Sequence, residues 1–207
     1  MREVVLPEEL VSQLQEIYQQ LEEDYDRIAK EIDFSCASCP DNCCDSYFLH
    51  HTYAEWAYLW LGFSLLEKKQ QDDIVEKSKD YLAQCEVARN ADQRPQVMCP
   101  LNDQGLCVLY KHRLLVCRTH GVPATMTRPD GQSMSFPGCF RCQDIVKEKY
   151  DKGSPPHVER TPLLRRLVVL ENELLENKRH MAPKVKISIA EMIVKGPPSL
   201  PGLHCER

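Results

Sequence analysis

The sequence of 207 residues lacks any apolar run long enough to cross a membrane. Its most apolar window, Tyr53 to Leu66, is interrupted by Glu55 and bounded by Lys68 and Lys69. Positive charge is not in excess either, because the formal net charge is -5. A nucleic-acid partner held through phosphate contacts needs a basic surface. We therefore expect neither a membrane nor a nucleic acid as partner.

A secretory signal is also missing. Glu3, Glu8 and Glu9 lie where a signal peptide would carry its apolar segment, and no small-residue cleavage site follows. We therefore expect a cytoplasmic protein. In a reducing compartment, eleven cysteines, which is also an odd number, are not expected to form a disulfide framework. That framework remains an alternative only for an exported chain.

The common signatures of catalysis are absent: there is no Gly-rich phosphate loop, no G-x-S-x-G and no H-E-x-x-H. We therefore assign no catalytic residue. The composition, 43% apolar and 28% charged, is that of an ordinary globular protein. The length suits one substantial core, so we expect a single domain.

What the sequence does contain is a dense cluster of cysteines, Cys36-x2-Cys39-x3-Cys43-Cys44. A second group follows between residues 99 and 142. Thiolates select zinc, copper(I) or iron-sulfur centres over magnesium and calcium. Cys85 lies alone on a predicted core face and Cys205 lies in the tail, so we leave both out. The candidate metal ligands are Cys36, Cys39, Cys43, Cys44, Cys99, Cys107, Cys117, Cys139 and Cys142.

Adjacent cysteines can hardly serve one tetrahedral ion without strain. Cys43 and Cys44 are therefore predicted to bind two different ions, or separate atoms of a polynuclear centre. Eight thiolates suffice for two sites of four, which leaves one of the nine spare. The C-x2-C pair Cys139 and Cys142 contains the candidates for that spare. We favour an iron-sulfur centre or iron ions, with zinc as the alternative.

A thiolate-bound metal centre is anionic, so nearby cations stabilise it. Arg113 and Arg118 lie in the same stretch as the later cysteines, and we expect them to stabilise the bound cofactor from behind the ligands. Arg128 and Arg141 are interpreted as solvated surface residues. His120, three residues after Cys117, is interpreted as a hydrogen-bond donor or a surface residue rather than a ligand.

The ordered pattern resembles the YkgJ-like cysteine-cluster family, the zinc- or iron-chelating CxxCxxxCC domain. The resemblance rests on the first cluster and on Cys99-Pro-Leu, Gly105-x-Cys107-x-x-Tyr110-x-x-Arg113 and Cys117-Arg118-x-x-Gly121. It covers residues 35–142. Leu114 stands where the family carries a proline. The resemblance implies metal chelation without a uniform reaction, and a related domain looks to be part of the flagellin lysine methylases.

Helical patterns flank the cysteines. Residues 1–34 are predicted to form an N-terminal amphipathic helix. Residues 35–150 are predicted to form a cysteine-cluster metal-binding domain with a helical insertion at 52–91. Residues 157–195 are predicted to form C-terminal helices that pack on this domain, and residues 196–207 an extended tail.

The apolar stripe of the first helix includes Tyr25. Within the insertion, the capping box Thr52-x-x-Glu55 opens one helix, and another is predicted from Asp72 to Ala91. Further helices are predicted from Asp144 to Tyr150 and from the capping box Ser188-x-x-Glu191. Residues 94–142 are expected to be loops with a short hairpin between Ala124 and Phe136.

The fold class predicted is mainly α, with a loop-rich, short-hairpin cysteine segment organised by metal. The function predicted is metal binding by clustered thiolates, with a redox or methyl-transfer-related role. The alternative is a structural zinc module that displays its helices to a protein partner. The oligomeric state is left open.

Overall fold

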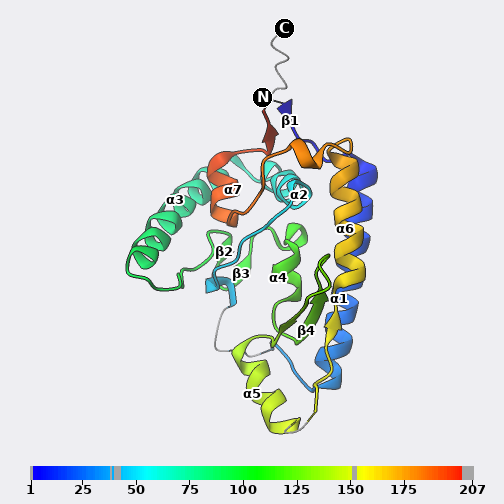
Figure 1. Ribbon diagram of the computed structural model, residues 1–207. Helices are drawn as coiled ribbons and strands as arrows, with labels where there is room; N and C mark the ends of the chain where they lie inside the picture. The colour runs from blue at the N-terminus through cyan, green and yellow to red at the C-terminus, as the bar shows by residue number, and fades with distance from the viewer. Residues whose placement is uncertain (1, 38, 40–42, 151–152, 202–207) are drawn as a thin grey trace. The chain divides into compact units, whose positions relative to one another are not determined.

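The computed structural model describes residues 2–37, 39, 43–150 and 153–201. Figure 1 shows its ribbon. The fold is mainly α with a few short strands, as the sequence predicted. The chain forms two compact units. Unit 1 comprises Met1–Val11, Cys44–Leu114 and Leu170–Arg207, and unit 2 comprises Ser12–Cys43 and Leu115–Val169.

The first helix, α1, spans Glu8–Glu31. Glu8 and Glu9 lie in its first turn, where carboxylates stabilise the positive end of the helix dipole. Its apolar stripe is buried, which confirms the predicted amphipathic helix; the buried members are Leu10, Leu14, Ile17, Leu21, Ile28 and Ile32, the last just beyond the helix end.

In unit 1, helices α2 (Tyr53–Ser64), α3 (Lys68–Asn90) and α7 (Ile189–Lys195) carry most of the core, and α7 packs on α3 (Figure 1). A hairpin pairs β2 (Asn102–Asp103) with β3 (Leu106–Cys107). Strand β1 (Arg2–Glu3) pairs antiparallel with β7 (Ser199–Leu200).

The helix starts of unit 1 are well capped. The Thr52 side chain accepts from the Glu55 amide, and Ser188 and Glu191 make both bonds of a capping box. Both caps were predicted from sequence. The start of α2 has a further, distant partner, because the Glu171 carboxylate accepts from the amides of Tyr53 and Ala54 at 3.0 and 2.9 Å.

In unit 2, α4 (Leu115–Thr119) leads into a three-stranded sheet of β4 (Ala124–Thr127), β5 (Ser133–Phe136) and β6 (Val158–Glu159), in the order β5-β4-β6. The register pairs Ala124 with Phe136, as the predicted hairpin requires. Helix α5 spans Phe140–Lys149, and α6 spans Thr161–Leu174. The core of unit 2 joins the end of α1 to the sheet and to α5.

Three boundaries differ from the prediction. Helix α3 begins at Lys68 rather than Asp72, and α5 begins at Phe140 rather than Asp144; neither has a capping side chain that a sequence pattern could reveal. The tail expected to be merely extended forms strand β7 at Ser199–Leu200. Its residues 202–207 lie outside the described residues.

No helix in the described ranges combines the length and hydrophobicity that a membrane span requires.

Candidate metal centre

Five of the predicted ligands gather in unit 2, and we call them the Tyr25 thiol group: Cys36, Cys39, Cys43, Cys139 and Cys142. They come from the segment after α1, from the short turn at Cys43, and from the start of α5. Two anchors bring the first and last of these segments together. Phe34 and Cys142 are buried in the same core, and Lys149 donates to the Ile32 carbonyl at 3.0 Å.

The phenol of Tyr25 lies among these thiols. Its hydroxyl is 3.5 Å from the Cys36 Sγ. Burial raises the pKa of Tyr25 well above its ordinary value, and the hydrogen bond with Cys36 and the negative charges of Cys36, Cys139 and Cys43 raise it further. Three thiols from distant parts of the sequence therefore act on one hydroxyl.

Two glycines permit this approach. The Cys139 amide donates to the Gly121 carbonyl at 3.0 Å. A Cβ on Gly138 would strike that same carbonyl, and a Cβ on Gly121 would strike the Tyr25 hydroxyl. The backbone φ is also positive at both residues, +86° at Gly138 and +137° at Gly121, which favours glycine. The backbone near Cys139 can therefore lie against Tyr25 only because these side chains are absent.

Arg141 provides the positive charge of the group. The hydrogen bond with the Cys39 thiolate, together with its charge and those of Cys139 and Cys36, raises the pKa of Arg141. Its Nη1 atom is buried and finds no hydrogen-bond partner among the described residues. The sequence prediction that Arg141 is solvated surface is therefore wrong, whereas Arg128 is exposed and pairs with Asp130 at 3.1 Å.

Cys142 is the innermost thiol, with 0% of its surface exposed. Burial raises its pKa to about 12, and the charges of Cys139 and Cys36 contribute further. Cys139 precedes it as the residue that caps α5. The N-terminus of α5, which carries a partial positive charge, therefore lies at this C-x2-C pair.

Three further thiols lie in unit 1, and we call them the hairpin thiol group: Cys44, Cys99 and Cys107. The Cys99 amide donates to the Cys44 carbonyl at 2.9 Å, and the Asn102 amide donates to the Cys99 carbonyl at 2.9 Å. Cys107 lies opposite Asn102 in the β2–β3 hairpin. The Asn102 Nδ2 is buried and has no hydrogen-bond partner within the described ranges.

Cys43 and Cys44 thus belong to different units, although one peptide bond joins them. On steric grounds, these two adjacent thiols are predicted to bind different ions or separate atoms of a polynuclear centre. Their membership in separate thiol groups agrees with that assignment, which remains a prediction.

The other predicted residues have defined surroundings. Arg118 forms an ion pair with Glu22 at 2.6 Å, and its guanidinium lies 4.5 Å from the centre of the Tyr18 ring. The Arg113 guanidinium lies 3.7 Å from the centre of the Tyr110 ring. Cys117 is partly buried on α4 in unit 2.

No disulfide forms among the cysteines of the described ranges. Within the same ranges, no three Cys, His, Asp or Glu side chains are arranged so that they could hold a metal ion. Within the described ranges, neither thiol group is therefore closed around a common point.

Sequence reasoning missed Tyr25, Arg141 and Asn102 as neighbours of the thiols. Tyr25 was assigned to the apolar stripe of α1, where its hydroxyl was the only signal of a polar environment. Arg141 stands between the members of a C-x2-C pair, a position that offered a signal. Asn102 follows Cys99 by three residues and could have been recognised from that spacing alone.

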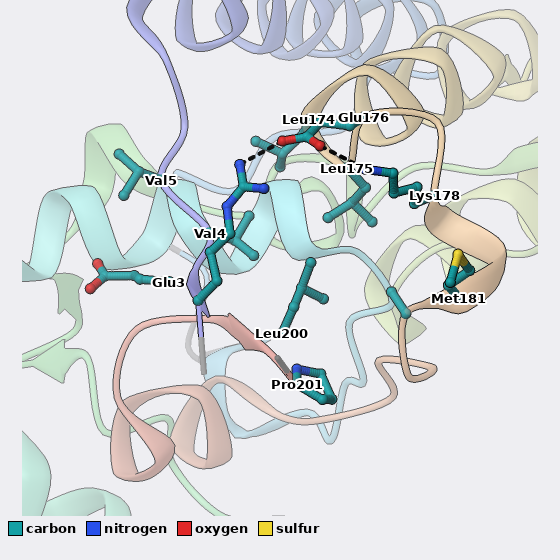
Figure 2. A pocket seen from close by; sticks show the side chains of 12 residues that line it. Glu3, Val4, Val5, Leu174, Leu175, Glu176, Lys178, Met181, Leu200 and Pro201 are labelled. Atoms are coloured by element: carbon teal, nitrogen blue, oxygen red, sulfur yellow. Dashed lines mark hydrogen bonds and ion pairs between the residues drawn. The ribbon is translucent and has the colours of Figure 1, made fainter. Parts of the chain in front are cut away.

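A separate cavity of about 350 Å³ lies in unit 1, between β1, β7 and the end of α6. Figure 2 shows its apolar lining, including Leu174 and Leu200. Of its charged residues, Glu176 pairs with Arg2 at 2.6 Å and with Lys178 at 3.0 Å, and Glu3 is the fourth. The cavity therefore presents no reactive or metal-binding group comparable to the thiols.

No family model, curated protein or solved structure matches this chain. What the two thiol groups can do therefore follows from their own residues.

Proposed function

We propose that this chain is a metal-binding protein whose clustered thiolates hold an iron-sulfur centre or iron ions, with a redox or methyl-transfer-related role. One observation carries the proposal: three thiols from separate segments, Cys36, Cys43 and Cys139, act on Tyr25, and Cys39 bonds to an arginine whose buried Nη1 has no partner in the described part of the chain. Soft thiolates in this number are typical ligands of iron-sulfur centres and zinc. The ordered cysteine pattern, which resembles the YkgJ-like family, is consistent with it.

The charges of the Tyr25 thiol group fit an anionic centre. A metal ion with four thiolates has a net negative charge, so a nearby cation and N–H donors stabilise it. Arg141 and the N-terminus of α5 supply these features. The ligands of this centre would come from Cys36, Cys39, Cys43, Cys139 and Cys142.

The hairpin thiol group would serve a second centre. Cys44, Cys99 and Cys107 supply three thiols there, and the partnerless Nδ2 of Asn102 is a donor suited to a metal-bound sulfur. In this arrangement, Cys43 binds in one centre and Cys44 in the other.

Zinc is the second candidate, and a specific observation favours it. Two C-x2-C pairs, Cys36 with Cys39 and Cys139 with Cys142, meet in the Tyr25 thiol group. Four thiolates make a closed tetrahedral site, which is the usual form of structural zinc. In this case the metal would stabilise the fold, and the helices would be displayed to a protein partner.

Metal and acid-labile sulfide analysis of anaerobically purified protein distinguishes these candidates. Iron with sulfide and visible absorption is expected for the iron-sulfur centre, and stoichiometric zinc without colour for the alternative. Cys43→Ser and Cys44→Ser are each expected to lose part of the metal, and the double variant to lose more than either. Cys85→Ser is the control, because Cys85 is buried in a separate core cluster of unit 1.

Protein without iron or zinc after anaerobic purification would overturn metal binding itself. If Cys43→Ser and Cys44→Ser lost the same metal and the double variant lost nothing further, the assignment to two centres would be wrong.

A further inference from the structure

A second hollow, of about 300 Å³, lies in unit 1. It is lined from α2 by Tyr53 and Trp56, from the end of α7 by Lys195, and from the segment 183–187 by residues that include Lys184. We call it the Trp56 hollow. It shares Pro201 with the cavity of Figure 2, so the two depressions are neighbours on the same unit.

The aromatic wall of the Trp56 hollow is fixed in place. The rings of Tyr53 and Trp56 are stacked, with centroids 6.3 Å apart and planes inclined by 18°. The Tyr53 hydroxyl donates to the Pro183 carbonyl at 3.2 Å, and the Trp56 indole N–H donates to the Gly196 carbonyl at 2.9 Å. Because these two polar groups already have partners, the rings offer a ligand mainly apolar contacts.

The charged residues that line this hollow are both cationic. They are Lys184 and Lys195, which are exposed, and within the described ranges neither forms an ion pair. The cavity of Figure 2 differs, because Glu176 there pairs with both Arg2 and Lys178. Two ammonium groups beside an apolar wall, with no carboxylate in the lining, favour a ligand of negative charge.

From this combination we propose that the Trp56 hollow binds a small aromatic carboxylate. The ring of the ligand packs against the aromatic wall, where ring pairs gain more than their buried area alone provides. Its carboxylate pairs with the ammonium groups of Lys184 and Lys195. The volume is at the small end for ligand pockets, which suits a molecule of one or two rings.

The backbone around the hollow supports a preformed site. Pro183 and Pro201 lie in its wall, and each proline has a fixed φ and no N–H that a ligand would have to satisfy. A wall that is already ordered lowers the entropy that binding costs. This binding goes beyond the proposed metal centre and does not depend on it, because the lining residues include no cysteine.

The test uses the full chain as purified and cinnamate as the probe. The chain contains two tryptophans, so its indole N–H region holds two resonances, and Trp60→Phe assigns them. Trp56 lines the hollow and Trp60 does not. Cinnamate is expected to shift the Trp56 resonance more than that of Trp60. No shift at about 10 mM cinnamate, or a larger shift at Trp60, would overturn the proposal.

Two further probes separate the contribution of the charge from that of the ring. Cinnamamide has the same ring but is neutral, and cyclohexanepropionate has a carboxylate but no aromatic ring. Both are expected to bind more weakly than cinnamate. If cinnamamide bound as tightly, the lysines would have no role as anion partners, and if cyclohexanepropionate did, the site would not be specific for an aromatic ligand; either result contradicts the proposal.

Lysine variants test the same site from the side of the protein. Lys184→Gln and Lys195→Gln are each expected to weaken cinnamate binding about two- to fivefold, the range that an exposed ion pair provides. Lys186→Gln is the matched control, because Lys186 is exposed in the same segment but does not line the hollow. Equal affinity in all three variants would show that the two lining lysines do not hold the carboxylate. Metal content is measured separately on the same samples, so the metal centre and the Trp56 hollow can fail independently.

Discussion

Arg128 and Arg141 lie thirteen positions apart in the same cysteine-rich stretch. Arg128 is exposed and pairs with Asp130, whereas Arg141 bonds to the Cys39 thiol and has a buried, partnerless N–H in the described part of the chain. Arg141 stands inside a C-x2-C pair and Arg128 does not, but the thiol of Cys39 reaches Arg141 only through the fold. The two arginines therefore form a natural test pair.

We expect Arg141→Gln to weaken metal binding by about 10–100-fold, the usual cost of losing a residue that supports the ligands of a metal. The substitution removes the charge that offsets the thiolates. Competition with a coloured chelator, with zinc as the probe metal, measures the change. Arg128→Gln is the control and should leave the affinity unchanged. Equal affinity in both variants would contradict a role of Arg141 at the centre.

Among the elements, α2 has an unusual cap. The Glu171 carboxylate is 3% exposed and accepts from two amides at the start of α2, while Arg179 pairs with it at 3.2 Å. Burial raises the pKa of Glu171, and the charge of Glu55 contributes in the same direction. One side chain of α6 therefore satisfies donors that α2 cannot satisfy internally.

Glu171→Gln is expected to cost about 1–3 kcal/mol of unfolding free energy, because a neutral amide replaces a carboxylate that accepts two N–H groups and an arginine. Urea unfolding measures the loss. Glu173→Gln, on the exposed side of the same helix, is the control and should be nearly neutral.

The pH dependence has a definite sign. Because the pKa of Glu171 is raised in the folded chain, folding takes up a proton at pH values above about 4.3, the ordinary value of a glutamate. The contribution of Glu171 to stability therefore falls as the pH rises through the folded pKa. The difference in unfolding free energy between wild type and Glu171→Gln should narrow as the pH rises from about 4.3 through the folded pKa of Glu171. A difference that widens with pH would contradict a raised pKa of Glu171.

Elements defined by local signals were predictable from the sequence. The caps at Thr52 and Ser188 each use a partner three residues away, and the hairpin that pairs Ala124 with Phe136 follows from its turn residues. Helix α5 was predicted too short because its cap residue is Cys139, which makes no side-chain capping bond.

The surroundings of the thiols were not predictable, because they depend on distant pairings. The sequence identified the cysteines themselves and the peculiarity of Cys43 next to Cys44. It did not place Tyr25 against Cys36 and Cys139, since that contact requires α1 to end beside the start of α5. The partition of the cysteines between two units likewise follows from contacts across the whole chain.

For the whole molecule, metal removal is expected to lower the thermal stability markedly. Bound zinc stabilises small thiolate sites by about 10 kcal/mol or more. The loss of thermal stability on metal removal should be larger at about pH 8 than at about pH 6, because metal binding displaces protons from the thiols. Cys142, with its pKa raised to about 12, carries such a proton at both pH values. Thermal unfolding with and without chelator measures the difference; identical curves would contradict a stabilising metal.

The pairing of β1 with β7 also determines when each unit can be completed during synthesis. Unit 2 needs no residue beyond Val169, whereas unit 1 needs Leu200 to pair with Arg2. At a translation rate of 5–20 residues per second, the intervening stretch takes about 2–6 s to emerge from the ribosome. The segments that carry the Tyr25 thiol group can therefore all be present on the nascent chain before β1 finds its partner strand in unit 1.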